Sequence, residues 1–253
     1  MILKLLRAAV TLAGLCLLWQ LVVWATGVPP FILPGPARVF EAIGAHVPML
    51  AQHAGVTFAE ILAGLALGAL LGASSALSLA YSRPARRWLL PLLVASQAIP
   101  VFALAPLLVL WFGYGIASKI AMASIIIYFP VTASFLDGLR RTETGWLDLA
   151  RTMDASRRAT LRHVQLPAAL PALASGLRVA TAVAPIGAVV GEWVGASRGL
   201  GFLMLHANAR MQIDVLFAAL FTLALFAVAL YYAVDVALRR ALPWQAELLP
   251  FQD

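Results

Sequence analysis

The chain has 253 residues, of which 62% are hydrophobic and only 11% are charged. Soluble domains carry about 25% charged residues, so this composition excludes an ordinary soluble domain and favours a protein whose main solvent is the lipid bilayer. The single cysteine, Cys16, lies in an apolar run and excludes a disulfide scaffold or a cysteine-rich metal site. The net charge of +7 suits either nucleic acid or a membrane surface, and the placement of the charges decides between them.

Six apolar segments are long enough, or nearly long enough, to cross a bilayer as helices. A crossing helix needs about 20 residues, because each residue rises about 1.5 Å and every backbone polar group must bond within the segment. The first segment is longer than the apolar core of a signal peptide, so we expect it to be a retained span. The chain is therefore predicted to be an all-α polytopic membrane protein in which residues 1–253 form one domain. The six segments are 8–28, 57–80, 89–112, 120–136, 179–195 and 215–234.

The positions of Lys and Arg predict the orientation of these spans, because loops rich in the two residues stay in the cytoplasm. With the N-terminus inside, only Arg38, Lys119, Arg198 and Arg210 of the 18 Lys+Arg fall outside. Both ends of the chain are therefore predicted to be cytoplasmic. The orientation of the spans explains where the basic residues lie, so nucleic acid is not an expected partner.

Helix breakers interrupt several of the predicted spans. Proline removes a backbone donor and clashes with the preceding turn, and membrane helices tolerate it where neighbours or water bond the freed carbonyls. Such breaks favour a moving bundle around a pathway over a rigid anchor. Small residues at four-residue spacing in the second segment are predicted to let helix backbones pack closely. The breakers are Pro100, Pro106, Pro130 and Pro185, and the small residues are Gly64, Gly68 and Gly72.

The longest stretch between predicted spans is residues 137–178. Its apolar residues partly recur at three- and four-residue spacing, which predicts short amphipathic helices. Asp154 is expected to cap the second of these helices, and Pro167 and Pro171 are expected to end it before the chain re-enters the membrane. The other long connection, residues 29–55, is predicted to be an external loop.

The segment from Asp148 to Pro167 resembles the signature of importer permeases of the ATP-binding-cassette (ABC) superfamily. The family pattern is Glu-Ala-Ala, three residues, Gly, nine residues and Ile-x-Leu-Pro. Asp148, Leu149 and Ala150 occupy the triplet, Asp154 the glycine position, and Val164, Leu166 and Pro167 the ending, with both spacings matched. Three residues depart from the pattern. Asp148 keeps the charge of Glu, Leu149 still offers an apolar contact, and Asp154 tolerates the left-handed backbone that suits glycine.

The resemblance implies that residues 137–178 form a cytoplasmic coupling loop, between the fourth and fifth spans, that docks on a separate ATPase subunit. It also implies a second permease copy in a homodimer, a periplasmic or lipid-anchored solute-binding protein, and a multi-pass location in the bacterial inner (cytoplasmic) membrane. ATP and Mg²⁺ are expected on the ATPase, and this chain is expected to hold no cofactor, metal or catalytic residue. Alternatively, or in addition, the arginines of the loop hold it inside and touch anionic lipid head groups. The residues expected to dock are Asp148, Leu149, Ala150, Asp154, Ala155, Arg158, Leu161, Val164, Leu166 and Pro167.

Further runs resemble the branch of permeases that import sulfonates, taurine, nitrate, bicarbonate and vitamin precursors. These runs are IPVFALAPLLVLWFGYG at 99–115 and GEWVGASRGLG at 191–201. Together with HANARMQID at 206–214, they are most similar to permeases for the hydroxymethylpyrimidine precursor of thiamine. The expected cargo is therefore this pyrimidine, and the alternative is a sulfonate, taurine, nitrate or riboflavin-like solute.

Polar side chains within the spans are candidates for the solute pathway, because burying them in a membrane is costly. A planar pyrimidine needs an aromatic wall with amide or hydroxyl partners, whereas an anionic sulfonate needs arginine or a helix N-terminus. The predicted spans contain no arginine, which favours a neutral solute. Gln97 could instead only join helices, Glu192 could satisfy loop amides or pair with Arg198, and Glu60 is expected to be solvated at the interface. The pathway candidates are Ser96, Gln97, Phe102, Tyr128, Glu192 and Trp193.

Two other classes of protein compete with a permease. A membrane enzyme would need a nucleophile, base or metal ligands held together, and the four histidines are scattered along the chain. The sequence has no Gly-x-x-x-x-Gly-Lys-Ser/Thr phosphate loop, so the chain is not its own ATPase by that route. A non-transporting membrane scaffold would also have six spans and a basic loop, but broken spans and the docking signature argue against it.

Overall fold

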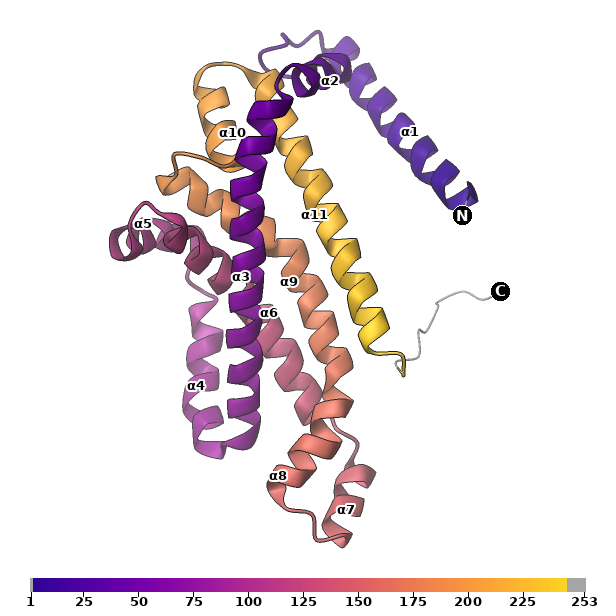
Figure 1. The fold of residues 1–253 in the computed structure, drawn as a ribbon, viewed down its shortest axis with the longest axis vertical. Coiled ribbons are helices and arrows are strands. Elements are labelled where there is room, and N and C mark those ends of the chain that lie inside the picture. Colours follow the sequence, from indigo (N-terminus) through magenta and orange to yellow (C-terminus); the bar gives the residue numbers. More distant parts are fainter. Residues whose placement is uncertain (1, 245–253) are drawn as a thin grey trace. The chain divides into compact units, whose positions relative to one another are not determined.

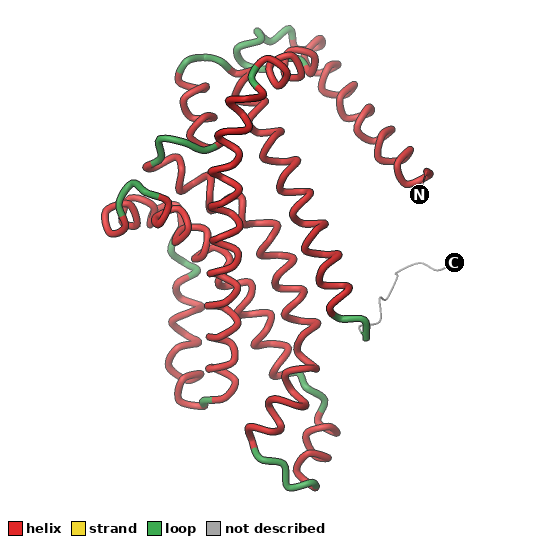
Figure 2. Tube along the Cα trace, viewed as in Figure 1, coloured by secondary structure: helices red, strands yellow, loops and turns green. Residues whose placement is uncertain are grey.

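The computed structural model describes residues 2–244, without the side chains of residues 2–5, 8, 9 and 83. Within that range the chain consists of helices and connecting loops, with no strand (Figures 1 and 2), so the predicted all-α class is confirmed. The helices are α1 (Ile2–Thr26), α2 (Pro36–Ala45), α3 (Val47–Tyr81), α4 (Arg83–Ser96), α5 (Val101–Phe112), α6 (Ile116–Arg140), α7 (Thr144–Thr152), α8 (Arg157–Thr160), the π-helical η1 (Leu161–Gln165), α9 (Leu166–Gly195), α10 (Leu200–Ala209) and α11 (Ile213–Ala241).

Four helical stretches are long and apolar enough to cross a membrane. They are α3, α6, the run Arg157–Gly195 that ends in α9, and α11. Each extends past its predicted segment, because backbone hydrogen bonding continues into polar residues that lower the local hydropathy. The first predicted segment coincides with α1, whose apolar part is the shorter Val10–Thr26. Six crossings with both ends in the cytoplasm remain a prediction.

The third predicted span is not one straight helix. α4 and α5 form a pair bent by 102° at a short break, which makes either a broken span or a re-entrant loop. The break falls at residues 97–100, and Pro100 is the residue that caps α5. A residue before proline avoids the helical region, and proline itself cannot donate to the preceding turn. The interruption predicted at Pro100 in the span over residues 89–112 is confirmed, and it takes the form of a bent pair of helices.

The structure divides the described chain into two compact units, Met1–Thr57 with Ser197–Leu225 and Phe58–Ala196 with Phe226–Asp253. Residues 1 and 245–253 lie outside the described residues, and the single domain over 1–253 remains a prediction. In the first unit, the backbone N–H of Leu200 donates to Thr57 Oγ1 at 2.7 Å, and that of Gly199 donates to His53 Nδ1 at 3.0 Å. The α10 N-terminus is thereby fixed to α3.

The connection predicted as a loop at residues 29–55 is mostly helical, and its external placement remains a prediction. α2 occupies Pro36–Ala45, and α3 already begins at Val47. Pro36 explains the start of α2, because proline fits the first helical turn, where its missing N–H costs nothing. Trp19 of α1 stacks on Phe217 and Phe221 of α11 in the same unit.

In the second unit, α6 packs closely against both α3 and α9. A Cβ added at Gly68 of α3 would lie 2.8 Å from Ile127 Cβ and 2.9 Å from the Ser124 carbonyl oxygen. A Cβ added at Gly187 of α9 would lie 2.6 Å from Ala123 Cα. Glycine is required at both positions because the partner is backbone or a stiff side chain. The prediction that the glycine row of the second span packs against another helix is confirmed.

Candidate functional site

The predicted coupling region is a helical hairpin at one end of the second unit (Figure 1). α6 continues to Arg140, and α9 starts at Leu166, so the loop is narrower than the expected 137–178. Pro167 and Pro171 do not end the second short helix, which corrects that prediction. Pro167 instead lies in the first turn of α9, where its missing N–H is tolerated, and the wider turns of η1 lead the chain directly into this long helix.

The turn after α7 forms a Schellman cap around Asp154. The Ala155 N–H donates to the Ala150 carbonyl oxygen at 2.9 Å, and the Asp154 N–H donates to that of Arg151 at 3.0 Å. This pattern needs a left-handed residue at the position after the cap, which is usually glycine. Asp154 has a φ of 52°, so it adopts the conformation that the family glycine suits. Asp154 does not cap the next helix as expected, because Ser156 accepts the Ala159 N–H at 3.2 Å instead.

Asp154→Val is expected to destabilise this turn by about 1–2 kcal/mol, because a β-branched residue resists left-handed backbone, whereas Asp154→Gly should be neutral or stabilising. Hydrogen exchange at the Asp154 and Ala155 amides measures the effect. Thr152→Val is the matched control, because Thr152 lies within α7, and it should leave exchange nearly unchanged. Equal amide exchange in Asp154→Val and Thr152→Val would contradict the requirement for a left-handed residue at position 154.

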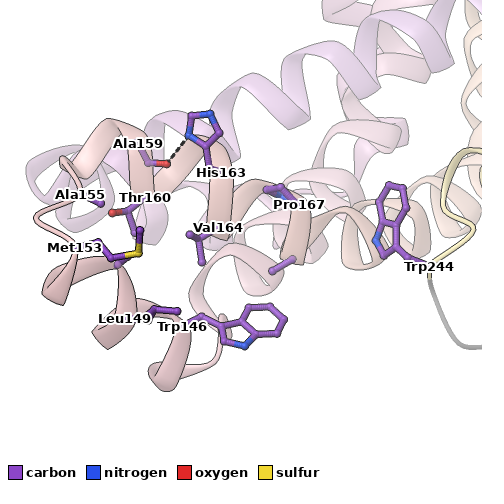
Figure 3. Close-up of a pocket in the computed structure, with 12 residues that line it drawn as sticks. Trp146, Leu149, Met153, Ala155, Ala159, Thr160, His163, Val164, Pro167 and Trp244 are labelled. Carbon is purple, nitrogen blue, oxygen red and sulfur yellow. Dashed lines mark hydrogen bonds between the residues drawn. The ribbon is translucent and has the colours of Figure 1, made fainter.

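An apolar cavity of about 600 Å³ lies between the two arms of this hairpin (Figure 3). Side chains of α7 line one side of it, and side chains from α8 to the start of α9 line the other. Trp146, Leu149 and Met153 are 51%, 60% and 73% exposed. Large apolar groups that gather at an exposed place mark an interaction site. The lining residues of the cavity are Trp146, Leu149, Ala150, Met153, Ala155, Ala159, Thr160, His163, Val164, Pro167, Ala168 and Trp244.

The hairpin is fixed to the membrane-spanning helices by several contacts. The Arg157 guanidinium lies 5.2 Å from the centre of the Tyr81 ring at the end of α3, and Gln165 Nε2 donates to the Leu139 carbonyl oxygen at 3.3 Å. Leu161 and Leu166 pack on the core cluster at the ends of α3, α6 and α9. These contacts fix α8, η1 and the start of α9 to the ends of α3 and α6. Arg158 is exposed, and Asp148 pairs with Arg151 at 2.6 Å.

The predicted pathway residues lie in different settings. Ser96 and Gln97 are exposed at the break between α4 and α5, where Gln97 Nε2 donates to Ser96 Oγ at 3.4 Å. Phe102 and Trp193 are 68% and 51% exposed, whereas the neighbouring Glu192 is only 1% exposed. Tyr128 lines a cavity of about 360 Å³ whose polar groups are hydroxyls. That cavity is lined by Ser74, Ser75, Ser78, Leu79, Leu89, Leu92, Leu93 and Tyr128.

Sequence reasoning missed a buried charged cluster that joins α3, α6 and α9. The Glu60 carboxyl is within hydrogen-bonding reach of Glu192, and both interact electrostatically with Lys119. Glu60 and Lys119 are each 2% exposed, so the expected interfacial solvation of Glu60 is wrong, and Lys119, just before the predicted fourth segment, is buried by helix packing. Lys119 Nζ also donates to the Tyr114 carbonyl oxygen at 2.7 Å and to that of Gly195. The ammonium group therefore ties the α5–α6 loop to the C-terminus of α9.

Comparison with known proteins assigns the family and supports the fold. Residues 64–244 match the family of binding-protein-dependent transport system inner membrane components. The chain belongs to this family. It is an ABC importer permease subunit and a multi-pass protein of the inner membrane, as the sequence resemblance predicted.

Three relatives cover nearly the whole chain. A probable ABC transporter permease of Haemophilus influenzae is 56% identical over 94% of this chain and 97% of the relative. The formylaminopyrimidine transport permease ThiX of Halalkalibacterium halodurans is 37% identical over 91% of this chain and 92% of the relative. The riboflavin transport permease RibX of Chloroflexus aurantiacus is 38% identical over 94% of this chain and 89% of the relative.

A chain of the MetNI methionine ABC transporter, solved in inward-facing conformations, has a similar fold. It superposes with a TM-score of 0.68 over 78% of this chain and 97% of that chain. The two sequences are 19% identical, so this likeness concerns the fold alone.

Proposed function

We propose that this permease imports a small, neutral heteroaromatic solute, most specifically a pyrimidine precursor of thiamine. The observation that carries the proposal is the cavity lined by Tyr128 and three serines of α3. Its polar groups are hydroxyls, which pair with ring nitrogens and amino groups but do not neutralise an anion. The names of the two relatives at 37% and 38% identity, for formylaminopyrimidine and riboflavin, support a ring-shaped cargo.

The proposal includes the partners that such a permease needs. The exposed apolar face of α7 and its C-cap residue, formed by Trp146, Leu149 and Met153, is proposed to dock on a separate ATPase subunit. A binding protein is proposed to deliver the solute on the opposite side of the membrane, and a second copy of the chain to complete the pathway. Hydrolysis by the ATPase would move α7, and the Arg157 and Gln165 contacts would pass that movement to α3 and α6.

Uptake into proteoliposomes tests the cargo. The permease, its ATPase and its binding protein are reconstituted together, and tritiated hydroxymethylpyrimidine is supplied with ATP enclosed on the ATPase side. We expect ATP-dependent uptake that excess taurine does not compete. Uptake of taurine in place of the pyrimidine would overturn the cargo and leave the importer role intact. Absence of uptake for pyrimidine, riboflavin and taurine alike, with an ATPase that hydrolyses ATP independently of binding protein, would favour the non-transporting scaffold.

A further inference from the structure

A second groove, between α4 and α6, combines an apolar wall with a charged end. It has a volume of about 390 Å³ and lies in the second unit. Its wall is formed mainly by leucine, valine and phenylalanine, and Asp137 and Arg140 close it at the end of α6. The lining residues are Leu90, Leu93, Val94, Phe129, Thr132, Ala133, Ser134, Leu136, Asp137 and Arg140.

The charged end of this groove carries positive charge that the described residues do not neutralise. The Asp137 carboxylate forms an ion pair with Arg141, whose Nε lies 2.9 Å from Asp137 Oδ2. Arg140, Arg86 and Arg87 make no ion pair with any side chain that the structure describes. Arg86 and Arg87 precede Leu90 by four and three residues, so they lie on the same face of α4 as the groove, one turn beyond it.

We propose that this groove binds an anionic phospholipid of the membrane. An acyl chain fits the apolar wall between α4 and α6, and the lipid phosphate is placed at the end that Arg140 lines. Helical spacing from Leu90 places the guanidinium donors of Arg86 and Arg87 toward the same end. Arginine suits this role because its planar donors match phosphate oxygens. Basic groups where membrane helices meet the interface attract anionic lipids in this way.

Two features favour a lipid over the other possible occupants. A soluble anion would leave the apolar wall uncovered in the bilayer. A second copy of the chain would have to supply negative charge. Of the five carboxylates in residues 137–178 and at Asp235, three already pair with arginines of their own chain, and the other two, Glu143 and Asp154, lie on the exposed hairpin. Charge complementarity therefore points to the lipid head group.

Native mass spectrometry of the intact transport complex tests the proposal. The complex is purified in detergent and titrated with phosphatidylglycerol or, separately, with phosphatidylcholine. We expect Arg140→Gln and Arg86→Gln each to weaken phosphatidylglycerol binding about fivefold, and the double variant about 25-fold, since each basic group contributes roughly equally. Arg240→Gln is the matched control, because it removes the same charge from an exposed arginine at the end of α11 that does not line the groove.

Three outcomes would overturn the proposal. The first is a loss in Arg240→Gln as large as in Arg140→Gln, which would show a general effect of net charge. The second is equal binding of phosphatidylcholine, which would show an apolar groove without head-group selection. The third is efficient cross-linking of Leu93→Cys to a second copy in native membranes, which would make the groove a subunit interface.

Discussion

Leu149→Glu combined with Met153→Glu is expected to reduce association with the ATPase by about 100-fold or more. Both side chains, from α7 and from its C-cap residue, are large, apolar and mostly exposed, and they line the 600 Å³ cavity. Burying each in a protein interface contributes about 1.5–3 kcal/mol, and replacing it by a carboxylate also introduces a charge that must be desolvated. Every 1.4 kcal/mol changes the dissociation constant tenfold, so the two together remove detectable binding.

Co-purification with the tagged ATPase and ATP-driven uptake measure this effect. Thr152→Glu is the matched control, because Thr152 is exposed on α7 but does not line the cavity. It should retain both activities. Ala150 and Leu161 are less informative targets, since Ala150 is 7% exposed and Leu161 packs on the core, so a charge at either would disturb the hairpin itself. Normal co-purification of the Leu149 and Met153 variant would contradict docking through α7.

Much of the fold could be predicted because the bilayer imposes one strong constraint on a span. A continuous apolar segment of sufficient length has to be helical, and that condition can be read from local sequence. The left-handed turn at Asp154 could be predicted for a similar reason, since the spacing of the family pattern places one residue where glycine is usual. Both features depend on residues that are neighbours in the chain.

The features that sequence reasoning missed depend on contacts between distant segments. Glu60 and Lys119 lie at the edges of predicted spans, where a charged residue is ordinarily solvated or helps to orient the span in the membrane. Their burial follows from the packing of α3, α6 and α9, which the sequence does not display. The 102° bend between α4 and α5 is a similar case. Pro100 predicts a break, but the angle depends on what the two helices pack against.

The second large effect is expected from Lys119→Met in the buried cluster. The side chain is 2% exposed, and its ammonium group is the positive charge that faces Glu60 and Glu192. Methionine keeps most of the volume but leaves two buried carboxyl groups without that charge. It also leaves the Tyr114 and Gly195 carbonyl oxygens without their donor. Removing one partner of a buried charged group costs about 3–5 kcal/mol.

Thermal or denaturant unfolding of the purified protein in detergent measures this loss of stability. Arg198→Met is the matched control, because it removes one exposed positive charge from the loop after α9 and should change the stability by less than about 0.5 kcal/mol. Adding Glu60→Gln to Lys119→Met should recover part of the loss, since it removes one of the two carboxyl groups left without the ammonium. A general packing defect at Lys119 would show no such recovery. Partial recovery of stability on adding Glu60→Gln would therefore show that Lys119 stabilises the packing of α3, α6 and α9 through its charge and not through its volume alone.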